Sequence, residues 1–575
     1  MNLFFSYQQK ISKVLKYLNK KKIIIYPKNF KNFTIELSPK DHKSDISTNI
    51  AMVLAKLNKK RPHDLGVVIK KELLLNFKEF KDIEIAGPGF LNIYFHDFFW
   101  RDYLKKVIHT NHKYGSNLTF KKKYNVEFVS ANPTGPLHVG HCRGAVLGDT
   151  LSNLLAFNGN KVTKEYYVND YGNQIKNFVL SVYYRILEIK EKKPFPNSDN
   201  FYPGLYIIDI AEKIIKQKKI KNFNNLNKIF KKLSSESLKL SIEIIKNNLK
   251  LLGIKHDIFV YESKIIEKNL VAKSIHQLKK ENYIYKGKLD PPKSEQTKGW
   301  EKREQLLFKS TLFGDDLDRP LQKSDGEWTY FAGDLAYHSY KISRKYNTLI
   351  NILGADHAGY TKRITSATKA LSKKRVELIC KVAQLVKLYK DGSPFKMSKR
   401  KGDYITVEDL ISEVGKDSVR FMMLNRSNDV ELDFDFKKVT EQSKDNPVFY
   451  VQYAYARINS IYRNLKLKID DKIKVNTGNF DLNSHEIEIL RKISEWPRCI
   501  EISINKMEPH RIPFYLYELV TLFHAYWNMG RDNEQYRFIK NNKATSNWKL
   551  LLLQALSIVI RNGMTILGVS VPKKM

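Results

Sequence analysis

Strand-like and helix-like segments alternate from residue 120 to about residue 400, and glycines stand in the connections between them. This alternation is typical of a parallel β-sheet covered by helices. The stretch 185–315 differs, because it is rich in Lys and Asn and contains helical runs such as SIEIIKNNLKLLG. The sequence therefore predicts an α/β domain over 120–400 with an insertion at about 185–315.

The flanking segments follow other patterns. Residues 1–110 begin with a lysine-rich helical stretch and end in IEIAGPGFLNIYF, where a Gly-Pro-Gly turn separates two alternating runs, so a small α+β unit is expected. Beyond residue 440 strand patterns vanish and apolar residues recur at helical spacing. We expect a helical bundle over 441–575, joined to the α/β domain by a connection over 401–440.

Cysteine usage and the apolar runs bear on the compartment. The three cysteines are far apart and form no Cys-x-x-Cys pair, which argues against a disulfide framework or structural zinc and fits a reducing compartment. The start MNLFFSYQQK does not resemble a signal peptide, and Gln554 and Ser557 interrupt the longest apolar run. We expect a soluble cytoplasmic protein that does not bind membranes.

The net charge of +40 suits a polyanionic partner such as nucleic acid. Lys, Asn and Ile are abundant everywhere, however, so a bias in the coding DNA explains much of this charge equally well. Charge alone leaves both explanations open.

The stretch PTGPLHVGHCRG, residues 133–144, lies where an alternating run ends in a turn and a helical pattern begins. His138 and His141 are therefore expected in the first helical turn, a position that favours anions. Gly140 permits close backbone approach, so the two imidazoles can donate to a phosphate. Metal ligation and a purely structural role are the alternatives.

A second motif, DGSPFKMSKRKGDY at residues 391–404, places Lys396, Lys399, Arg400 and Lys401 in a short glycine-bearing loop. Alone it is an ordinary solvated basic loop. Together with the histidine motif it fits a site whose two halves close on a triphosphate.

The two motifs resemble the HIGH and KMSKS signatures of class I aminoacyl-tRNA synthetases, as HVGH and KMSKR. YYVNDYGNQI, DRPLQKSDGEWTYFAGDLAYH, GADHAGY and NPVFYVQYAYARI are similar to the bacterial arginyl-tRNA synthetases in particular, and the resemblance covers nearly the whole chain. It implies a Rossmann-type catalytic domain with an inserted connective segment, an N-terminal domain that docks on the tRNA elbow, a stem-contact connection over 401–440 and an all-α anticodon-binding bundle. The implied activity is ligation of L-arginine to tRNA(Arg) with ATP, through arginyl-adenylate.

The resemblance also implies roles at the ATP site. His138 and His141 would stabilise the α-phosphate, and Lys396 and Lys399 would neutralise the β- and γ-phosphates, which makes these four the expected catalytic residues. Mg²⁺ would accompany ATP as part of the substrate, with no tightly bound cofactor and no metal held by the protein. The residues implied in ATP binding are His138, Gly140, His141, Gly354, Asp356, His357, Gly359, Met397, Ser398 and Lys399.

An arginine site needs carboxylates, because a guanidinium group favours planar, bidentate acceptors. Tyr330 and Asp334 are four residues apart and would share one face of a helix. The resemblance places this pair on the guanidinium group, with Glu127 beside it and Asn132 near the α-amino and carboxylate groups. An ordinary exposed pair is the alternative for Tyr330 and Asp334.

Contact with tRNA is expected from FYVQYAYAR. Tyr450, Gln452, Tyr453 and Arg457 would face the anticodon loop, because unstacked bases favour aromatic platforms. A core role for the two tyrosines is the alternative. The family resemblance further implies a monomer.

Two departures from the family pattern are visible. Many arginyl enzymes lack the second lysine of KMSK and carry a compensating lysine before HIGH, whereas this chain has Lys399 and has Gly135 at the upstream place, so the two features agree. Relatives usually read His-Gly-Asp where this chain reads HKSD, so Lys43 and Ser44 replace an expected glycine turn.

Three other functions stay open. They are a different HxGH nucleotidylyl transferase, a catalytically silent RNA-binding relative and a sister class I synthetase. The helical C-terminal third argues against a different nucleotidylyl transferase, and the intact motifs argue against a silent relative. A sister synthetase would differ in the amino acid that it prefers.

Overall fold

The computed structural model describes residues 2–28, 30, 32–39, 43–118, 121–289, 304–323, 325–395, 405–475 and 480–575. The chain forms two compact units. One is continuous, Leu118–Glu441, and the other combines both ends of the chain, Met1–Asn117 and Gln442–Met575. The N-terminal and C-terminal parts expected from the sequence therefore share one body.

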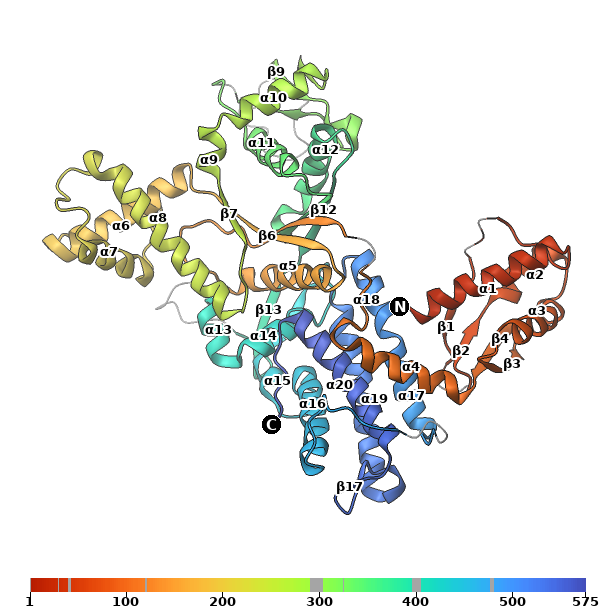
Figure 1. The fold of residues 1–575 in the computed structure, drawn as a ribbon. Coiled ribbons are helices and arrows are strands. Elements are labelled where there is room, and N and C mark those ends of the chain that lie inside the picture. The colour runs from red at the N-terminus through yellow and green to blue at the C-terminus, as the bar shows by residue number, and fades with distance from the viewer. Residues whose placement is uncertain are drawn as a thin grey trace. The chain divides into compact units, whose positions relative to one another are not determined.

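A five-stranded parallel sheet runs through the unit Leu118–Glu441 (Figure 1). Its order is β12-β11-β5-β6-β7. The chain moves outward from β5 to β7 and then returns to the other side of β5, so the order reverses between β5 and β11. In such sheets ligands bind beyond the carboxyl ends of the strands at this switch point. The predicted parallel sheet is confirmed. The strands are β5 Lys123–Glu127, β6 Lys161–Val168, β7 Ile258–Tyr261, β11 Thr348–Gly354 and β12 Glu377–Ala383.

Helices and short strands surround this sheet. Leu335 and Ala336 of α11 and Ala367 of α12 are fully buried in one apolar cluster with β11 and β12. The sheet thus gains the covered face that parallel strands require. The elements are α5 Val139–Phe157, α11 Tyr330–Ser343, η3 Ala355–Tyr360, α12 Thr361–Leu371, β13 Val386–Lys390, β14 Ser393–Pro394, α13 Val407–Val414, α14 Lys416–Met422, β15 Leu432–Asp435 and α15 Phe436–Thr440.

The Lys- and Asn-rich stretch 185–315 does not form a single insertion. Three helices build a core of their own between β6 and β7, and the first of them begins before residue 185. They are α6 Asn173–Glu191, α7 Leu205–Gln217 and α8 Leu226–Leu251. The chain then returns to the central sheet as β7 before it leaves again. The second excursion holds α9 Glu262–Glu267, α10 Leu270–Lys280, β8 Ile284–Gly287, β9 Gln305–Phe308, η2 Ser310–Phe313 and β10 Arg319–Pro320.

The other unit contains the expected α+β part and the expected helical bundle. The N-terminal part has an antiparallel sheet of order β1-β2-β4-β3, and the bundle carries one short hairpin, β16-β17. The first part comprises α1 Leu3–Lys20, β1 Ile35–Leu37, β2 Ile46–Thr48, α2 Ile50–Asn58, α3 Pro62–Asn76, β3 Phe80–Ala86, β4 Phe90–Phe95, α4 Asp97–Thr110 and η1 Asn111–Lys113. The bundle comprises α16 Pro447–Asn464, α17 Ser484–Ser494, α18 Trp496–Asn505, α19 Arg511–Asp532, η4 Glu534–Tyr536, β16 Ile539–Lys540, β17 Lys543–Ala544 and α20 Asn547–Leu567.

Buried polar contacts join these two parts. Asp45, from the HKSD stretch, accepts hydrogen bonds from Nε1 of Trp100 at 3.0 Å and from Nε of Arg491 at 2.6 Å. Trp496 is fully buried and donates to the carbonyl of Tyr114 at 3.0 Å. A Cβ on Gly115 would lie 2.4 Å from the Trp496 ring, so only glycine fits there. The two ends of the chain therefore share a core.

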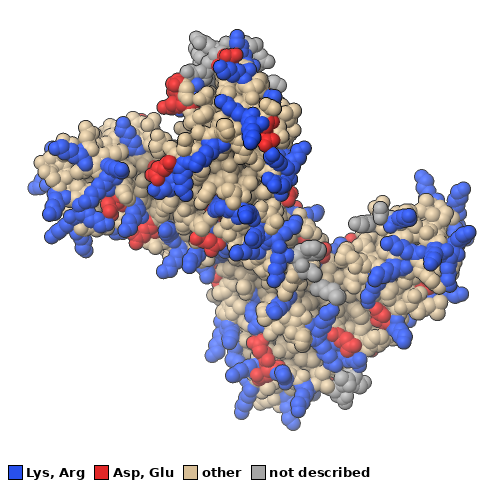
Figure 2. All heavy atoms as spheres, turned by 45° about the horizontal axis from the view of Figure 1, so that its top comes forward, with Lys and Arg blue, Asp and Glu red and all other residues tan. Residues whose placement is uncertain are grey.

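One described helix, α20, is long and apolar enough to cross a membrane, but 89% of its apolar window is buried inside the protein. A mostly buried core helix would have the same length and apolar composition. Lys and Arg side chains are spread over the whole face shown in Figure 2 and do not gather on a single element.

Candidate active site

The two histidines occupy the start of α5, as the sequence predicts. His138 is the N-cap, and its Nδ1 accepts a hydrogen bond from the amide of Gly140 at 3.1 Å. Nδ1 of His141 accepts from the amide of His138 at 3.2 Å, and the two ring centres are 3.9 Å apart. Because both Nδ1 atoms accept, each neutral ring carries its proton on Nε2.

Burial keeps both rings neutral. It lowers the pKa of His138, and it lowers the pKa of His141 to about 4, with a further contribution from neighbouring His138. A Cβ on Gly140 would lie 2.9 Å from Cε1 of His138, so glycine leaves room for the capping ring. The helix start therefore presents two uncharged N–H donors at the switch point of the sheet.

The residues that follow the basic motif are bound to this helix start. The amide of Val139 donates to the carbonyl of Ile405 at 2.9 Å, and the amide of Val407 donates to the carbonyl of Leu137 at 2.9 Å. Lys396, Met397, Ser398 and Lys399 themselves lie outside the described residues. The chain that leaves the basic motif is thus fixed beside the histidines.

Asp334 belongs to a half-buried group of carboxylates, the acidic pocket. It is on α11, as the spacing predicts, and it accepts a hydrogen bond from the hydroxyl of Tyr360. Burial raises the pKa of Asp334 to about 6 despite this hydrogen bond, and the charge of Glu127 adds to the rise. Tyr330, at the first position of the same helix, is 86% exposed. Only one member of the predicted pair is therefore enclosed.

Glu127 already has a cationic partner. The ammonium of Lys341, which is fully buried, pairs with Glu127 and also donates to Oδ1 of Asn351 at 2.9 Å. Asn351 lies opposite Glu127 in the register of β11 and β5. The charge of Glu127 is thus balanced within the protein before any ligand binds.

Glu262 is a site residue that the sequence reasoning missed. It begins α9 directly after β7, and burial, together with the charges of Asp334 and Asp170, raises its pKa to about 7. Asp170 follows β6 in the same way and accepts from the hydroxyl of Ser263 at 2.6 Å. The available signal was positional, because EYYVND and IFVYE both place a carboxylate just after a strand-like run.

The stretch GADHAGY lies between the histidines and the acidic pocket. Gly354 ends β11, and the negative charge of Asp356 raises the pKa of His141, against the larger lowering by burial. Tyr360 reaches Asp334 from the other end of the stretch. His357 pairs with Asp356 at 3.4 Å, and both are exposed. Gly359, in the same 3₁₀ turn, has open space around its Cα.

Asn132 lies apart from this cluster of contacts. Its side-chain amide donates to Oε1 of Gln174 at 2.8 Å in an exposed position. This hydrogen bond is equally consistent with a structural role for Asn132 and with a role in binding the α-amino group of arginine.

The four predicted anticodon residues lie on α16 and are partly buried. The guanidinium of Arg457 donates to the hydroxyl of Tyr453 at 3.1 Å and lies 4.2 Å from the centre of its ring. Tyr450 packs on His524 with ring centres 4.2 Å apart, and Gln452 donates to the carbonyl of Ser570 at 3.0 Å. Contacts within the bundle thus hold these four side chains in place, and all four are half-buried.

A doubly wound parallel sheet with a histidine-bearing helix start at its switch point, followed by a helical bundle, is the architecture of the class I aminoacyl-tRNA synthetases. Three family models match successive parts of the chain: "Arginyl tRNA synthetase N terminal domain" over 6–95, "tRNA synthetases class I (R), catalytic domain" over 103–463 and "DALR anticodon binding domain" over 451–575. The chain belongs to the arginyl-tRNA synthetase family.

Known relatives agree with this assignment. The arginine–tRNA ligase of Pelagibacter ubique is 55% identical over the full length of both chains. That of Roseobacter denitrificans is 44% identical over 95% of each. The Thermus thermophilus arginyl-tRNA synthetase structure has a similar fold, with a TM-score of 0.72 at 19% identity over all of both chains. The family and the arginine–tRNA ligase function predicted from the sequence are confirmed.

Proposed function

We propose that this chain ligates L-arginine to tRNA(Arg) in two steps at the carboxyl edge of its parallel sheet. A carboxylate oxygen of arginine attacks the α-phosphorus of ATP, which gives arginyl-adenylate and releases pyrophosphate. The terminal ribose hydroxyl of the tRNA then attacks the carbonyl carbon, and AMP leaves. Neither step needs a covalent intermediate on the protein, so positioning and charge stabilisation supply the catalysis.

The proposal depends above all on one observation: two neutral imidazole donors and a half-buried pair of carboxylates, Asp334 and Glu262, lie at the same edge of the sheet. Donation from Nε2 of His138 and His141 to the α-phosphate is worth about 3 kcal/mol per donor in comparable sites. Lys396 and Lys399 would carry the charge of the departing pyrophosphate, with Mg²⁺ bound to ATP. Gly354, Asp356, His357 and Gly359 would hold the adenosine end, as Met397 and Ser398 would from the basic loop.

The acidic pocket accounts for the amino acid. Asp334 and Glu262 together offer the oxygens that a guanidinium group needs, and binding a cation between them relieves their mutual repulsion. Tyr330 would close the pocket from its rim, and Glu127 would act through its pairing with Lys341. Asn132 stays a candidate for the α-amino and carboxylate groups.

The remaining parts of the proposal concern tRNA and the cellular setting. Tyr450, Gln452, Tyr453 and Arg457 would receive the anticodon loop, and residues 1–110 the tRNA elbow. The enzyme would act as a monomer in the cytoplasm, without membrane contact.

The test is ATP–pyrophosphate exchange with each of the twenty amino acids, with and without tRNA. We expect exchange with arginine alone, and the family resemblance predicts that it requires tRNA. Exchange with another amino acid would move the chain to a sister specificity. A folded protein that binds tRNA but exchanges with no amino acid would contradict the proposal.

A further inference from the structure

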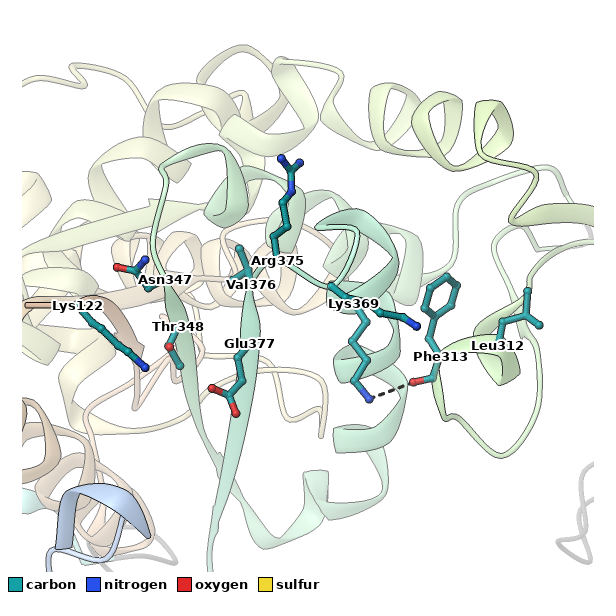
Figure 3. Close-up of a pocket in the computed structure, with 10 residues that line it drawn as sticks. Lys122, Leu312, Phe313, Asn347, Thr348, Lys369, Arg375, Val376 and Glu377 are labelled. Atoms are coloured by element: carbon teal, nitrogen blue, oxygen red, sulfur yellow. Dashed lines mark hydrogen bonds between the residues drawn. The ribbon is translucent and has the colours of Figure 1, made fainter. Parts of the chain in front are cut away.

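A separate cavity of about 640 Å³ opens at the amino edge of the same parallel sheet (Figure 3). Its lining includes Lys122, which precedes β5, and Thr348 and Glu377, which begin β11 and β12. All strands of this sheet run in one direction, so the pocket lies about 20 Å, the length of β11, from the carboxyl edge where the histidines lie. It is not part of the site described above.

The charge of this pocket is strongly positive. Its lining contains four cationic side chains and one carboxylate, Glu377; the cations are Lys122, Lys369, Lys374 and Arg375. Lys369 donates to the carbonyl of Phe313 at 3.2 Å, which ties the last turn of α12 to η2 and fixes one wall. Within the described ranges, the ammonium groups of Lys122 and Lys374 form no ion pair, so they are available to an anion.

The two ends of the pocket differ in character. Lys122, Asn347 and Thr348 lie at one end in Figure 3, and Leu312 and Phe313 lie at the other. Oδ1 of Asn347 accepts from the amide of Lys123 at 2.7 Å. Its side-chain NH₂ group donates to no residue in the described part of the chain and can donate to a ligand. Both ends thus offer cations, Lys122 at one and Lys369 beside Phe313 at the other, and only the second adds apolar side chains. Polar groups beside an apolar wall in a pocket of this volume can hold a small molecule.

We propose that this pocket binds a small organic phosphate of the nucleoside diphosphate or triphosphate class. The phosphates would lie on Lys122, Lys374 and Arg375, and the base would lie against Leu312 and Phe313. A duplex RNA backbone fits less well, because it presents phosphates on a convex ridge and would leave the apolar end unused.

The experiment counts ADP bound per chain by equilibrium dialysis, with and without a nonhydrolysable arginyl-adenylate analogue that fills the catalytic site. We expect two ADP per full-length chain without the analogue and one with it. The variant Lys374→Asn with Arg375→Gln should weaken the analogue-resistant site about tenfold or more. Asn suits the left-handed backbone at residue 374 (φ 61°), so this variant should fold. Lys373→Asn is the matched control, because Lys373 also has left-handed backbone (φ 52°) but pairs with Glu281 outside the pocket.

A single ADP per chain, or a second site that the double variant leaves unchanged, would overturn the proposal. Weakened tRNA binding by the double variant, with no analogue-resistant ADP, would instead assign the pocket to RNA and also overturn it. An analogue that displaces no ADP would count against the proposed function, whereas the double variant would still report on this pocket.

Discussion

Asp334 and Glu262 are two half-buried carboxyl groups close enough for the charge of one to act on the other, and they should set the pH dependence of arginine use. Their pKa values in the free enzyme are about 6 and about 7, and arginine binds the ionised forms. We therefore expect kcat/KM for arginine to fall as the pH drops through this range, since kcat/KM reports the free enzyme. The measurement is exchange kinetics from about pH 5 to about pH 8.

Glu262→Gln should remove one of the two titrations, while KM for ATP stays level across the same range. A kcat/KM for arginine that does not change with pH would contradict the acidic pocket. The two apparent values belong to the pair as a whole, because each charge acts on the other group.

Asp334→Asn tests the guanidinium contact directly. The change keeps the shape and the hydrogen bond from Tyr360 but removes the charge, so we expect kcat/KM for arginine to fall by about 2 to 5 kcal/mol, roughly 30-fold to several thousand-fold. Asp316→Asn, which alters an exposed carboxylate paired with Lys362, is the control. Equal effects of the two changes on exchange kinetics would refute the assignment.

At this scale the sequence predicted residues whose local pattern carries the signal, such as the histidines at a helix start and Asp334 on a helix face. It could not predict that Lys341 balances Glu127, because 214 residues separate the two. For Glu262 the sequence offered only its position after a strand-like run, because its raised pKa depends on burial and on the charges of Asp334 and Asp170, which are distant in sequence.

The start of α5 is the element on which catalysis depends most. Gly140→Ala would place a Cβ 2.9 Å from the His138 ring, which must then shift. A displacement of about 1 Å costs about a hundredfold in rate, so we expect a fall of that order in kcat for exchange.

Gly144→Ala on the same helix is the matched control, because its Cβ would find its nearest neighbour, Ile352, at 3.8 Å. Its kcat should stay close to that of the parent enzyme. If both substitutions lowered kcat alike, the effect would belong to the helix and not to the imidazole.

A buried ion pair joins α5 to α14. Asp149 accepts from Arg420 at 2.6 Å and from Lys164 at 2.6 Å. Burial alone would raise the pKa of Asp149, but these cations hold it below its ordinary value, so the stability it provides is present at neutral pH and is lost as the pH falls through the lowered pKa. Asp149→Asn should cost about 3 to 5 kcal/mol, because it removes the carboxylate that pairs with the buried guanidinium of Arg420 at 2.6 Å.

The shift of the urea midpoint measures this loss. Glu267→Gln, which removes an exposed pair with Lys264 in the same unit, should change the midpoint little. A similar midpoint for both variants would show that the buried pair does not stabilise the unit.

Elements with long, regular patterns were predictable, and a short one was not. The α/β alternation and the helical C-terminal part are found as expected, whereas β7 lies unforeseen inside the supposed insertion. A four-residue run such as IFVY cannot be distinguished from the flank of a helix by periodicity, and its place in the sheet depends on pairing with β6.

On the scale of the molecule, the net charge of +40 should make tRNA binding strongly dependent on salt. If six or more phosphates are contacted, raising the salt from about 50 to about 200 mM should weaken affinity by about a thousandfold or more. Filter binding measures this. The KM for arginine should change far less, because Asp334 and Glu262 are half-buried and therefore less screened by salt than surface charges. An affinity for tRNA that is insensitive to salt would show that the charge has no part in binding.

The union of the two chain ends also has a consequence for synthesis. Ribosomes add about 5 to 20 residues per second. Arg491 and Trp496 are therefore synthesised on the order of tens of seconds after Asp45 and Gly115, with which they pack. The unit Leu118–Glu441 can fold during that interval. The unit that combines the two chain ends cannot complete its core until residues 442–575 are made. A chain that stops early therefore leaves its first hundred residues with an unfilled core, exposed to proteases. Chains whose translation is incomplete should therefore be degraded more readily than complete ones.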